Sequence, residues 1–207
     1  MPDFELEDKI LGIVAGVDEA GRGPWVGPVV AGCAVFLSRN VDEKLLANLN
    51  DSKKLSKKKR EMLYDLLLEE AQKGNMLIGI GEASAQEIDE INILNASFLA
   101  MKRALDKACV KKPDLVLVDG NREPKNFGCE VKAVIKGDAK SYSVSAASIL
   151  AKVYRDRLME KMAVQYPYYG FEKNAGYGTK AHIEGLKKYG ITPEHRKSYA
   201  PIKEFLK

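Results

Sequence analysis

The chain has 207 residues, of which 45% are hydrophobic and 30% are charged, and its formal net charge is +4. This length and balance are ordinary for one globular domain with a sizeable core. No apolar run approaches the roughly 20 residues that span a bilayer, and the acidic N-terminus lacks the basic-then-apolar order of a signal peptide. We therefore expect a cytoplasmic protein with no membrane partner.

Cysteine and histidine are too scattered to indicate metal or disulfide chemistry. Cys33, Cys109 and Cys129 are far apart and form no C-x-x-C pair, so neither a zinc site nor a disulfide framework is indicated. Buried or incidental thiols in a reducing compartment are the simpler interpretation. His182 and His195 are too isolated in the sequence for a zinc site.

The first predicted strand ends in two adjacent acids. An apolar segment indicates a buried strand over residues 12–18, which delivers Asp18 and Glu19, and a second strand follows over 28–37. The residues between them hold three glycines and a proline, which predicts an antiparallel hairpin with a functional loop. Adjacent carboxylates repel, and Mg²⁺ or Mn²⁺ would relieve that repulsion. The glycines allow close backbone approach to a ligand, and Arg22 suits a phosphate.

Three long helices are predicted farther along the chain. Ser56 is the N-cap of a helix over 57–72, and Ser84 opens a helix over 85–107 through a capping box. The apolar face of the second of these helices includes Ile88 and Ile91. A third helix, over 143–165, is rich in small residues that allow close packing against a sheet.

Strands are predicted between these helices, over residues 76–81, 114–120 and 129–136. Past residue 166 the chain becomes polar, basic and aromatic, with a short helix near 179–189. The order of elements indicates an α/β domain over 1–165, with 166–207 as a helical substrate-binding extension of the same domain.

Acidic residues recur at the ends of three predicted strands. Asp18 and Glu19 close the first, Asp119 closes the strand over 114–120, and Asp138 follows the next. Strand ends of an α/β sheet converge on one edge, and four carboxylates gathered there would need about two divalent ions. This favours two-metal phosphoryl chemistry. The alternative is that each acid is a turn or cap residue, which is the commoner role of an acid at a strand end.

Two other chemistries fit the sequence poorly. The Gly21-x-Gly23 pair leads into a strand, whereas a dinucleotide fingerprint must open a helix, and Gly27 arrives one residue late for that fingerprint. Ser145 and Ser148 lack a plausible histidine partner, which argues against a serine nucleophile.

Basic segments indicate a polyanionic partner. Six Lys or Arg residues and no acid lie between Ser52 and Arg60, and basic residues near the C-terminus alternate with Tyr177, Tyr189 and Tyr199. Such surfaces suit a polyanion that also offers surfaces for stacking. A solvated, lysine-rich helix face is the alternative.

A set of ordered motifs extends over about residues 12–202. The principal motifs are Asp18-Glu19-Ala20-Gly21-Arg22-Gly23-Pro24, Val116-Leu117-Val118-Asp119-Gly120, Lys136-Gly137-Asp138 and Ser145-Ala146-Ala147-Ser148-Ile149-Leu150-Ala151-Lys152-Val153 with Arg155-Asp156. Shorter matches lie at residues 50–56, 176–179 and 195–199. In these motifs and their order the chain resembles ribonuclease HII, a type 2 ribonuclease H.

The resemblance implies a ribonuclease H-like fold, a mixed five-stranded sheet flanked by helices, here with a small C-terminal helical appendage. It also implies endonucleolytic cleavage on the 5′ side of ribonucleotides, in RNA–DNA hybrids and at single ribonucleotides in duplex DNA, leaving a 3′-hydroxyl and a 5′-phosphate. The role would be removal of misincorporated ribonucleotides and RNA primers. The catalytic carboxylates carry over onto Asp18, Glu19, Asp119 and Asp138, which would bind Mn²⁺ or Mg²⁺, two ions during catalysis.

The resemblance also assigns substrate contacts. Gly21, Arg22 and Gly23 would sense the ribose 2′-hydroxyl at the RNA–DNA junction, which is the group that separates RNA from DNA. Tyr177 would stack on the sugar on the DNA side, with Tyr166, Tyr168 and Tyr169 as alternatives for that role, and Lys53 and Lys54 would hold phosphates. We expect a monomer, and residues 201–207 show no glutamine-led aromatic motif for a sliding clamp.

Two other functions remain to be weighed against this one. A noncatalytic hybrid-binding protein would use the basic surfaces without turnover. A small-molecule metallophosphatase would use the acids on a mononucleotide, although the spread of basic residues along the chain disfavours it.

Overall fold

The computed structural model describes residues 1–206. A five-stranded sheet in the order β3-β2-β1-β4-β5 forms the centre of the fold. The strands are β1 (Val14–Ala20), β2 (Val29–Phe36), β3 (Met76–Ala83), β4 (Leu115–Asp119) and β5 (Glu130–Val134). The first three are antiparallel, whereas β4 and β5 run parallel to β1, so the sheet is mixed. The predicted hairpin and the predicted fold class are both confirmed.

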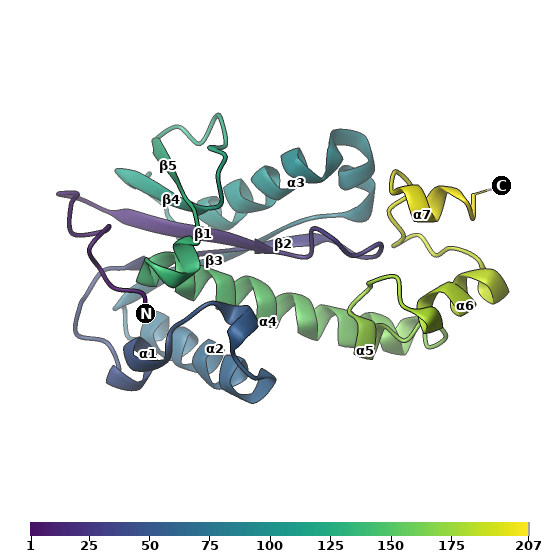
Figure 1. The fold of residues 1–207 in the computed structure, drawn as a ribbon. Helices are drawn as coiled ribbons and strands as arrows, with labels where there is room; N and C mark the ends of the chain where they lie inside the picture. The colour runs from purple at the N-terminus through teal and green to yellow at the C-terminus, as the bar shows by residue number, and fades with distance from the viewer. Residues whose placement is uncertain (207) are drawn as a thin grey trace.

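Helices cover both faces of this sheet (Figure 1). The long α3 (Ala85–Ala108) lies on one face, and α4 (Tyr142–Gln165) lies on the other with α1 (Glu43–Asn48) and α2 (Lys57–Gln72). Short 3₁₀ turns, η1 (Ser52–Lys54) and η2 (Gly137–Ala139), precede α2 and α4. Three short helices, α5 (Phe171–Asn174), α6 (Lys180–Tyr189) and α7 (Ala200–Lys203), gather beyond the far end of α4.

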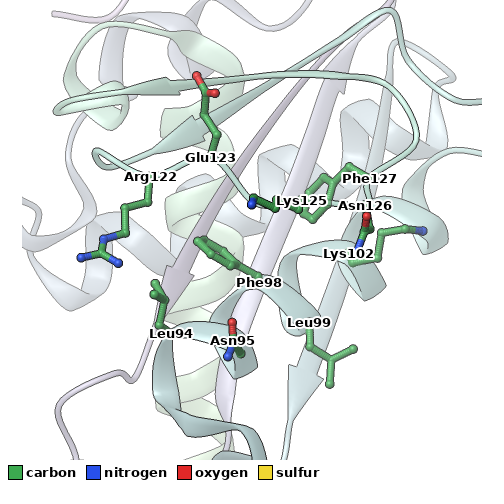
Figure 2. A pocket seen from close by; sticks show the side chains of 10 residues that line it. All are labelled: Leu94, Asn95, Phe98, Leu99, Lys102, Arg122, Glu123, Lys125, Asn126 and Phe127. Atoms are coloured by element: carbon green, nitrogen blue, oxygen red, sulfur yellow. The ribbon is translucent and has the colours of Figure 1, made fainter.

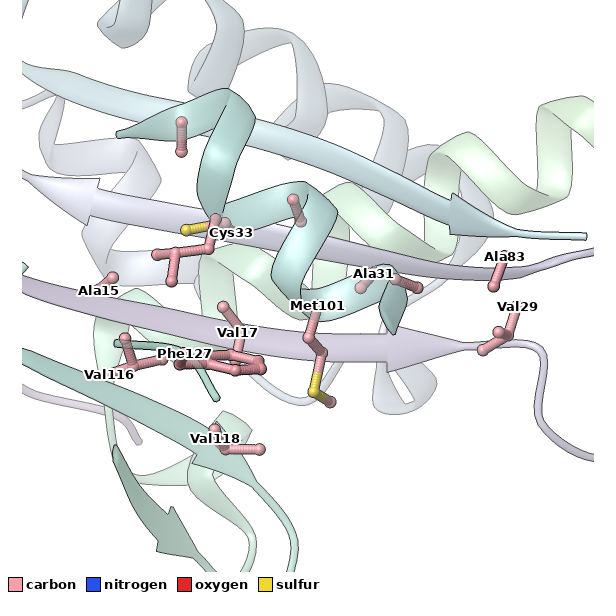
Figure 3. Packing of buried hydrophobic residues seen from close by; sticks show 14 of the residues in the cluster. Ala15, Val17, Val29, Ala31, Cys33, Ala83, Met101, Val116, Val118 and Phe127 are labelled. Atoms are coloured by element: carbon pink, nitrogen blue, oxygen red, sulfur yellow. The ribbon is translucent and has the colours of Figure 1, made fainter. Parts of the chain in front are cut away.

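Two hydrophobic layers hold the helices to the sheet. Figure 3 shows the layer beneath α3, where Val17, Val118 and Met101 pack with Phe127 from the β4–β5 loop. On the other face, α4 approaches the strands so closely that a Cβ added to Gly16 would lie 2.2 Å from the carbonyl carbon of Ser143. The small residues predicted to allow this approach are buried in α4.

Most predicted elements lie where the sequence placed them, including the Ser56 cap and the complete Ser84 capping box. The expectation for Ile91 is wrong: its side chain is exposed. Asn92, with φ of +66°, kinks α3 at this point, so the face on either side of it does not continue in one helical register. No helix within residues 1–206 has both the length and the apolarity needed to cross a membrane.

Candidate active site

The parallel pairing of β1 with β4 brings the predicted acids together at one edge of the sheet. Val17 pairs with Val118, so Asp18 and Asp119 follow at adjacent positions of neighbouring strands. Asp18 is buried, and its side chain accepts a hydrogen bond of 2.6 Å from the Glu19 N–H. Asp119 accepts one of 2.7 Å from the N–H of Gly137. That bond ties the end of β4 to η2, the turn that carries Asp138.

Negative charge accumulates at this edge. Burial raises the pKa of Asp18 well above its usual range, and Glu19, Asp119 and Asp138 raise it further. Burial also raises the pKa of Glu19, against the opposing effect of Arg22, whose guanidinium lies 3.2 Å from it. The pKa of Asp138 is raised to about 6, first by burial and then by Asp119 and Asp51. The four predicted carboxylates therefore act on one another in a partly dry environment.

These side chains fit a divalent cation by their chemistry. All four offer hard oxygen ligands, and their mutual repulsion is what a cation would relieve. Among residues 1–206, however, no three His, Cys, Asp or Glu side chains are close enough together to form a ready metal site. The acidic side chains are near one another but do not form a closed coordination shell.

The loop after β1 rests on a buried arginine. Arg196 is fully buried and donates hydrogen bonds to the carbonyl oxygens of Gly21 (2.6 Å), Arg22 (2.9 Å) and Gly27 (2.9 Å). The Tyr199 hydroxyl donates a further bond of 2.5 Å to the Arg22 carbonyl. The backbone N–H groups of Arg22 and Gly23 donate to no residue within 1–206. The loop thus directs its carbonyls inward and leaves two N–H groups for a ligand.

A second buried arginine supports the same loop. Arg155 donates to the carbonyl oxygens of Val26 (3.1 Å), Pro28 (3.3 Å) and Ala175 (3.1 Å). Burial, and then the neighbouring Arg196, lowers the pKa of Arg155 to about 10, so it remains charged at neutral pH. Gly21 has a φ of +96°, and a Cβ there would lie 2.0 Å from Nε of Arg155. The position therefore requires glycine for both conformation and space.

Tyr177 lies directly beside this loop. A Cβ on Gly23 would be 3.3 Å from the Tyr177 ring, although the tyrosine remains 53% exposed. The Tyr177 carbonyl is held by His182 at 3.0 Å, and His182 in turn contacts His195 at 3.1 Å. Both histidines are buried, and both have lowered pKa values, first of all because of that burial. The neutral pair fixes the backbone that presents Tyr177.

One cavity of about 280 Å³ collects most of the predicted site residues. It is lined by Asp18, Glu19, Ala20, Gly21, Arg22, Gly23, Ser52, Lys53, Ser148, Lys152, Arg155 and Tyr177. Asp119 shares a smaller hollow of about 60 Å³ with Glu19, whereas Asp138 lines neither of these two cavities. Lys54 does not line the cavity; its ammonium lies 3.9 Å from Asp51.

Sequence reasoning did not assign the supporting residues. Arg155 and Arg196 lie inside motif segments, yet nothing in their spacing shows that both donate to the carbonyls of one loop. Asp51 was also missed, although it raises the pKa of Asp138. Its position in a matched segment at residues 50–56 was the only signal.

A mixed five-stranded sheet with acids at the ends of β1 and β4 defines a ribonuclease H-like enzyme. The family model for Ribonuclease HII matches residues 15–201. The chain is 50% identical over 201 residues to ribonuclease HII of Wolbachia sp. subsp. Brugia malayi, covering 97% of this chain and 94% of that protein. It is 51% identical over 207 residues to ribonuclease HII of Gluconobacter oxydans, covering 100% and 97%.

A solved structure agrees with these sequence relatives. The crystal structure of ribonuclease H2 from Pyrococcus horikoshii OT3 has a TM-score of 0.73 at 34% identity and covers 93% of this chain and 96% of its own. The chain belongs to the ribonuclease HII family. It is thus a type 2 ribonuclease H, a metal-dependent endoribonuclease.

Proposed function

We propose that this enzyme hydrolyses the phosphodiester on the 5′ side of a ribonucleotide, both in RNA–DNA hybrids and at single ribonucleotides in duplex DNA. The products would be a 3′-hydroxyl and a 5′-phosphate. The observation that carries the proposal is the single cavity in which Asp18 and Glu19 face Gly21, Arg22 and Tyr177. The carboxylates that would hold the metal ions and the loop that would bind the ribose therefore line the same cavity.

Asp18, Glu19, Asp119 and Asp138 would hold two Mn²⁺ or Mg²⁺ ions. Asp18 is the central ligand, since it is the most buried of the four and its pKa is raised by the other three. Bound ions would supply a hydroxide-like nucleophile and neutralise the departing oxygen. The repulsion among the four carboxylates supports this assignment, because it makes the apo site electrostatically costly.

Selection of the cleavage site would fall to the loop and to Tyr177. The N–H groups of Arg22 and Gly23 are available to a ribose 2′-hydroxyl, which can both donate and accept a hydrogen bond. Tyr177 would stack on the sugar of the following deoxynucleotide. Lys53 would hold a phosphate at the cavity, whereas Lys54 would contact the backbone farther out.

In the cell, such an enzyme would act as a monomer in the cytoplasm on misincorporated ribonucleotides and RNA primers. The partners of this reaction are the RNA–DNA hybrid and ribonucleotide-containing duplex DNA.

A duplex with one ribonucleotide tests the proposal. With Mn²⁺ or Mg²⁺ we expect a single cut 5′ to the ribonucleotide and a product with a free 3′-hydroxyl, and no cut with EDTA or in the all-DNA duplex. Asp18→Asn should abolish cleavage while retaining most of the binding. An intact substrate after incubation with folded enzyme and metal would refute the proposal, and binding without turnover would favour the noncatalytic alternative. Hydrolysis of a mononucleotide with none of the duplex would favour the phosphatase.

A further inference from the structure

A hollow larger than the cavity just described lies outside it. It has a volume of about 690 Å³, within the roughly 300–1,000 Å³ range of ligand sites. One wall is α3 beyond its kink, and the other is the loop that joins β4 to β5 (Figure 2). We call this hollow the lateral groove and define it by Leu94, Phe98, Lys102, Arg122, Lys125 and Phe127.

The lateral groove offers both positive charge and an aromatic floor. Figure 2 shows the Phe98 ring and the Lys125 side chain facing the space between the two walls. Glu123 also lines the groove, and its carboxylate accepts a hydrogen bond of 3.3 Å from the N–H of Ala133. Arg122 and Lys125 form no ion pair with any acid in the described part of the chain. Unpaired cations above an aromatic surface are suited to a phosphate with an adjoining base.

The wall formed by α3 is held rigidly. At the kink, the Asn92 side chain accepts hydrogen bonds from the N–H groups of Leu94 (3.0 Å) and Asn95 (3.1 Å). These bonds cap the helical segment that carries Phe98. The opposite wall is anchored by Phe127, which is 4% exposed and packs in the core beneath α3. The groove is therefore largely preformed.

The lateral groove is continuous with the catalytic edge. The small hollow that contains Glu19 and Asp119 is also lined by Leu94, Phe98 and Arg122, which are groove residues. Tyr177 lines the other cavity, which shares Glu19 and Arg22 with this small hollow. The acids thus lie between two openings, with Tyr177 on one side and the groove on the other.

We propose that the lateral groove binds the nucleotides immediately 5′ of the cut in the cleaved strand. Their bases would pack on Phe98, and their phosphates would face Arg122 and Lys125. The inference rests on the proposed function, in which Tyr177 takes the 3′, DNA side of the ribonucleotide. A strand that runs from Tyr177 past the acids next reaches the groove. There its negative phosphates are complementary to the positive charges of Arg122 and Lys125.

The test pairs two groove variants with two substrates. Arg122→Ala/Lys125→Ala removes both cations, and Phe98→Leu removes the ring while keeping its bulk, with Phe98→Tyr as the variant that restores it. Lys111→Ala/Lys132→Ala is the matched control, because both lysines are exposed and lie outside the groove. One duplex has ten nucleotides 5′ of the ribonucleotide, and the other has a single nucleotide there.

We expect Arg122→Ala/Lys125→Ala to raise KM on the long duplex by about tenfold with kcat within about twofold, and to reduce the salt dependence of binding by one to two phosphates. Phe98→Leu should raise KM by about fivefold, and Phe98→Tyr should restore it. On the short duplex, which keeps only one nucleotide 5′ of the cut, the groove variants should raise KM by no more than about twofold. The control should match the parent on both.

Equal KM values for the groove variants and the parent on the long duplex would overturn the proposal. So would an equal loss on both duplexes, which would place the groove on the complementary strand or on the 3′ side. If the parent cleaves neither duplex, the proposed function has failed. In that case, dissociation constants of the same variants for the two duplexes are measured in EDTA by fluorescence anisotropy. They test binding at the groove independently of cleavage.

Discussion

Arg196→Lys is the sharpest test of how the loop after β1 is held. The substitution keeps the positive charge but removes the planar fork that reaches three carbonyl oxygens. Each hydrogen bond from a charged group contributes about 1.5–3 kcal/mol. A lysine ammonium at this fully buried position can retain part of the set, so we expect the free energy of unfolding to fall by about 2–4 kcal/mol.

The same substitution should lower activity more than a general loss of stability would. If one loop carbonyl swings free, the N–H groups of Arg22 and Gly23 lose their fixed direction. If the transition state loses about 1.5–3 kcal/mol of stabilisation from these N–H groups, kcat/KM on a single-ribonucleotide duplex falls by about 10–150-fold. The discrimination between ribose and deoxyribose at the cleavage site should fall with it.

The assay measures kcat/KM on ribonucleotide and all-DNA duplexes beside a urea unfolding curve. Arg39→Lys is the matched control, since that guanidinium lies on the surface against Asp8 and Phe4 and lines no cavity with the loop. It should leave cleavage unchanged. A folded Arg196→Lys enzyme that cleaves within threefold of the parent would refute the reasoning.

Three further predictions follow from the site. Gly21→Ala forces a side chain onto Arg155 at a φ of +96°, so we expect a loss of more than about 3 kcal/mol in unfolding free energy and no measurable cleavage. Asp119→Asn should abolish cleavage while duplex binding in EDTA, measured by anisotropy, stays within about threefold. The pKa of His195 is lowered to about 4 by burial and by His182. Neutral His195 therefore stabilises the fold fully above pH 6.5, and about 3 kcal/mol of unfolding free energy is lost as the pH falls towards 4. The difference between urea unfolding curves at pH 7.5 and pH 5 should be smaller for His195→Gln than for the parent enzyme.

The sequence predicted the sheet well because its strands are short, apolar and punctuated by glycine, proline and acids. The proximity of Asp18 and Asp119 could be predicted, because each residue lies at the end of a strand and these strand ends meet at one edge of the sheet. The role of Arg196 could not be predicted, because it depends on a turn 175 residues earlier meeting the C-terminal segment. The exposure of Ile91 was missed because periodicity assumes one continuous helix, whereas the first helical segment of α3 ends at this residue, directly before Asn92 with its φ of +66°.

The C-terminal segment supports the loop after β1 through backbone and side-chain hydrogen bonds. The backbone after the loop is fixed from both ends of that segment: Trp25 donates to the Gly176 carbonyl at 2.9 Å, and Arg196 donates to the Trp25 carbonyl at 2.8 Å. Val26 is fully buried among apolar residues of α4 and the C-terminal helices. The loop that would read the ribose is therefore clamped between the sheet and this segment. On the proposed function, this arrangement would let a segment poor in acids influence the position of the cut.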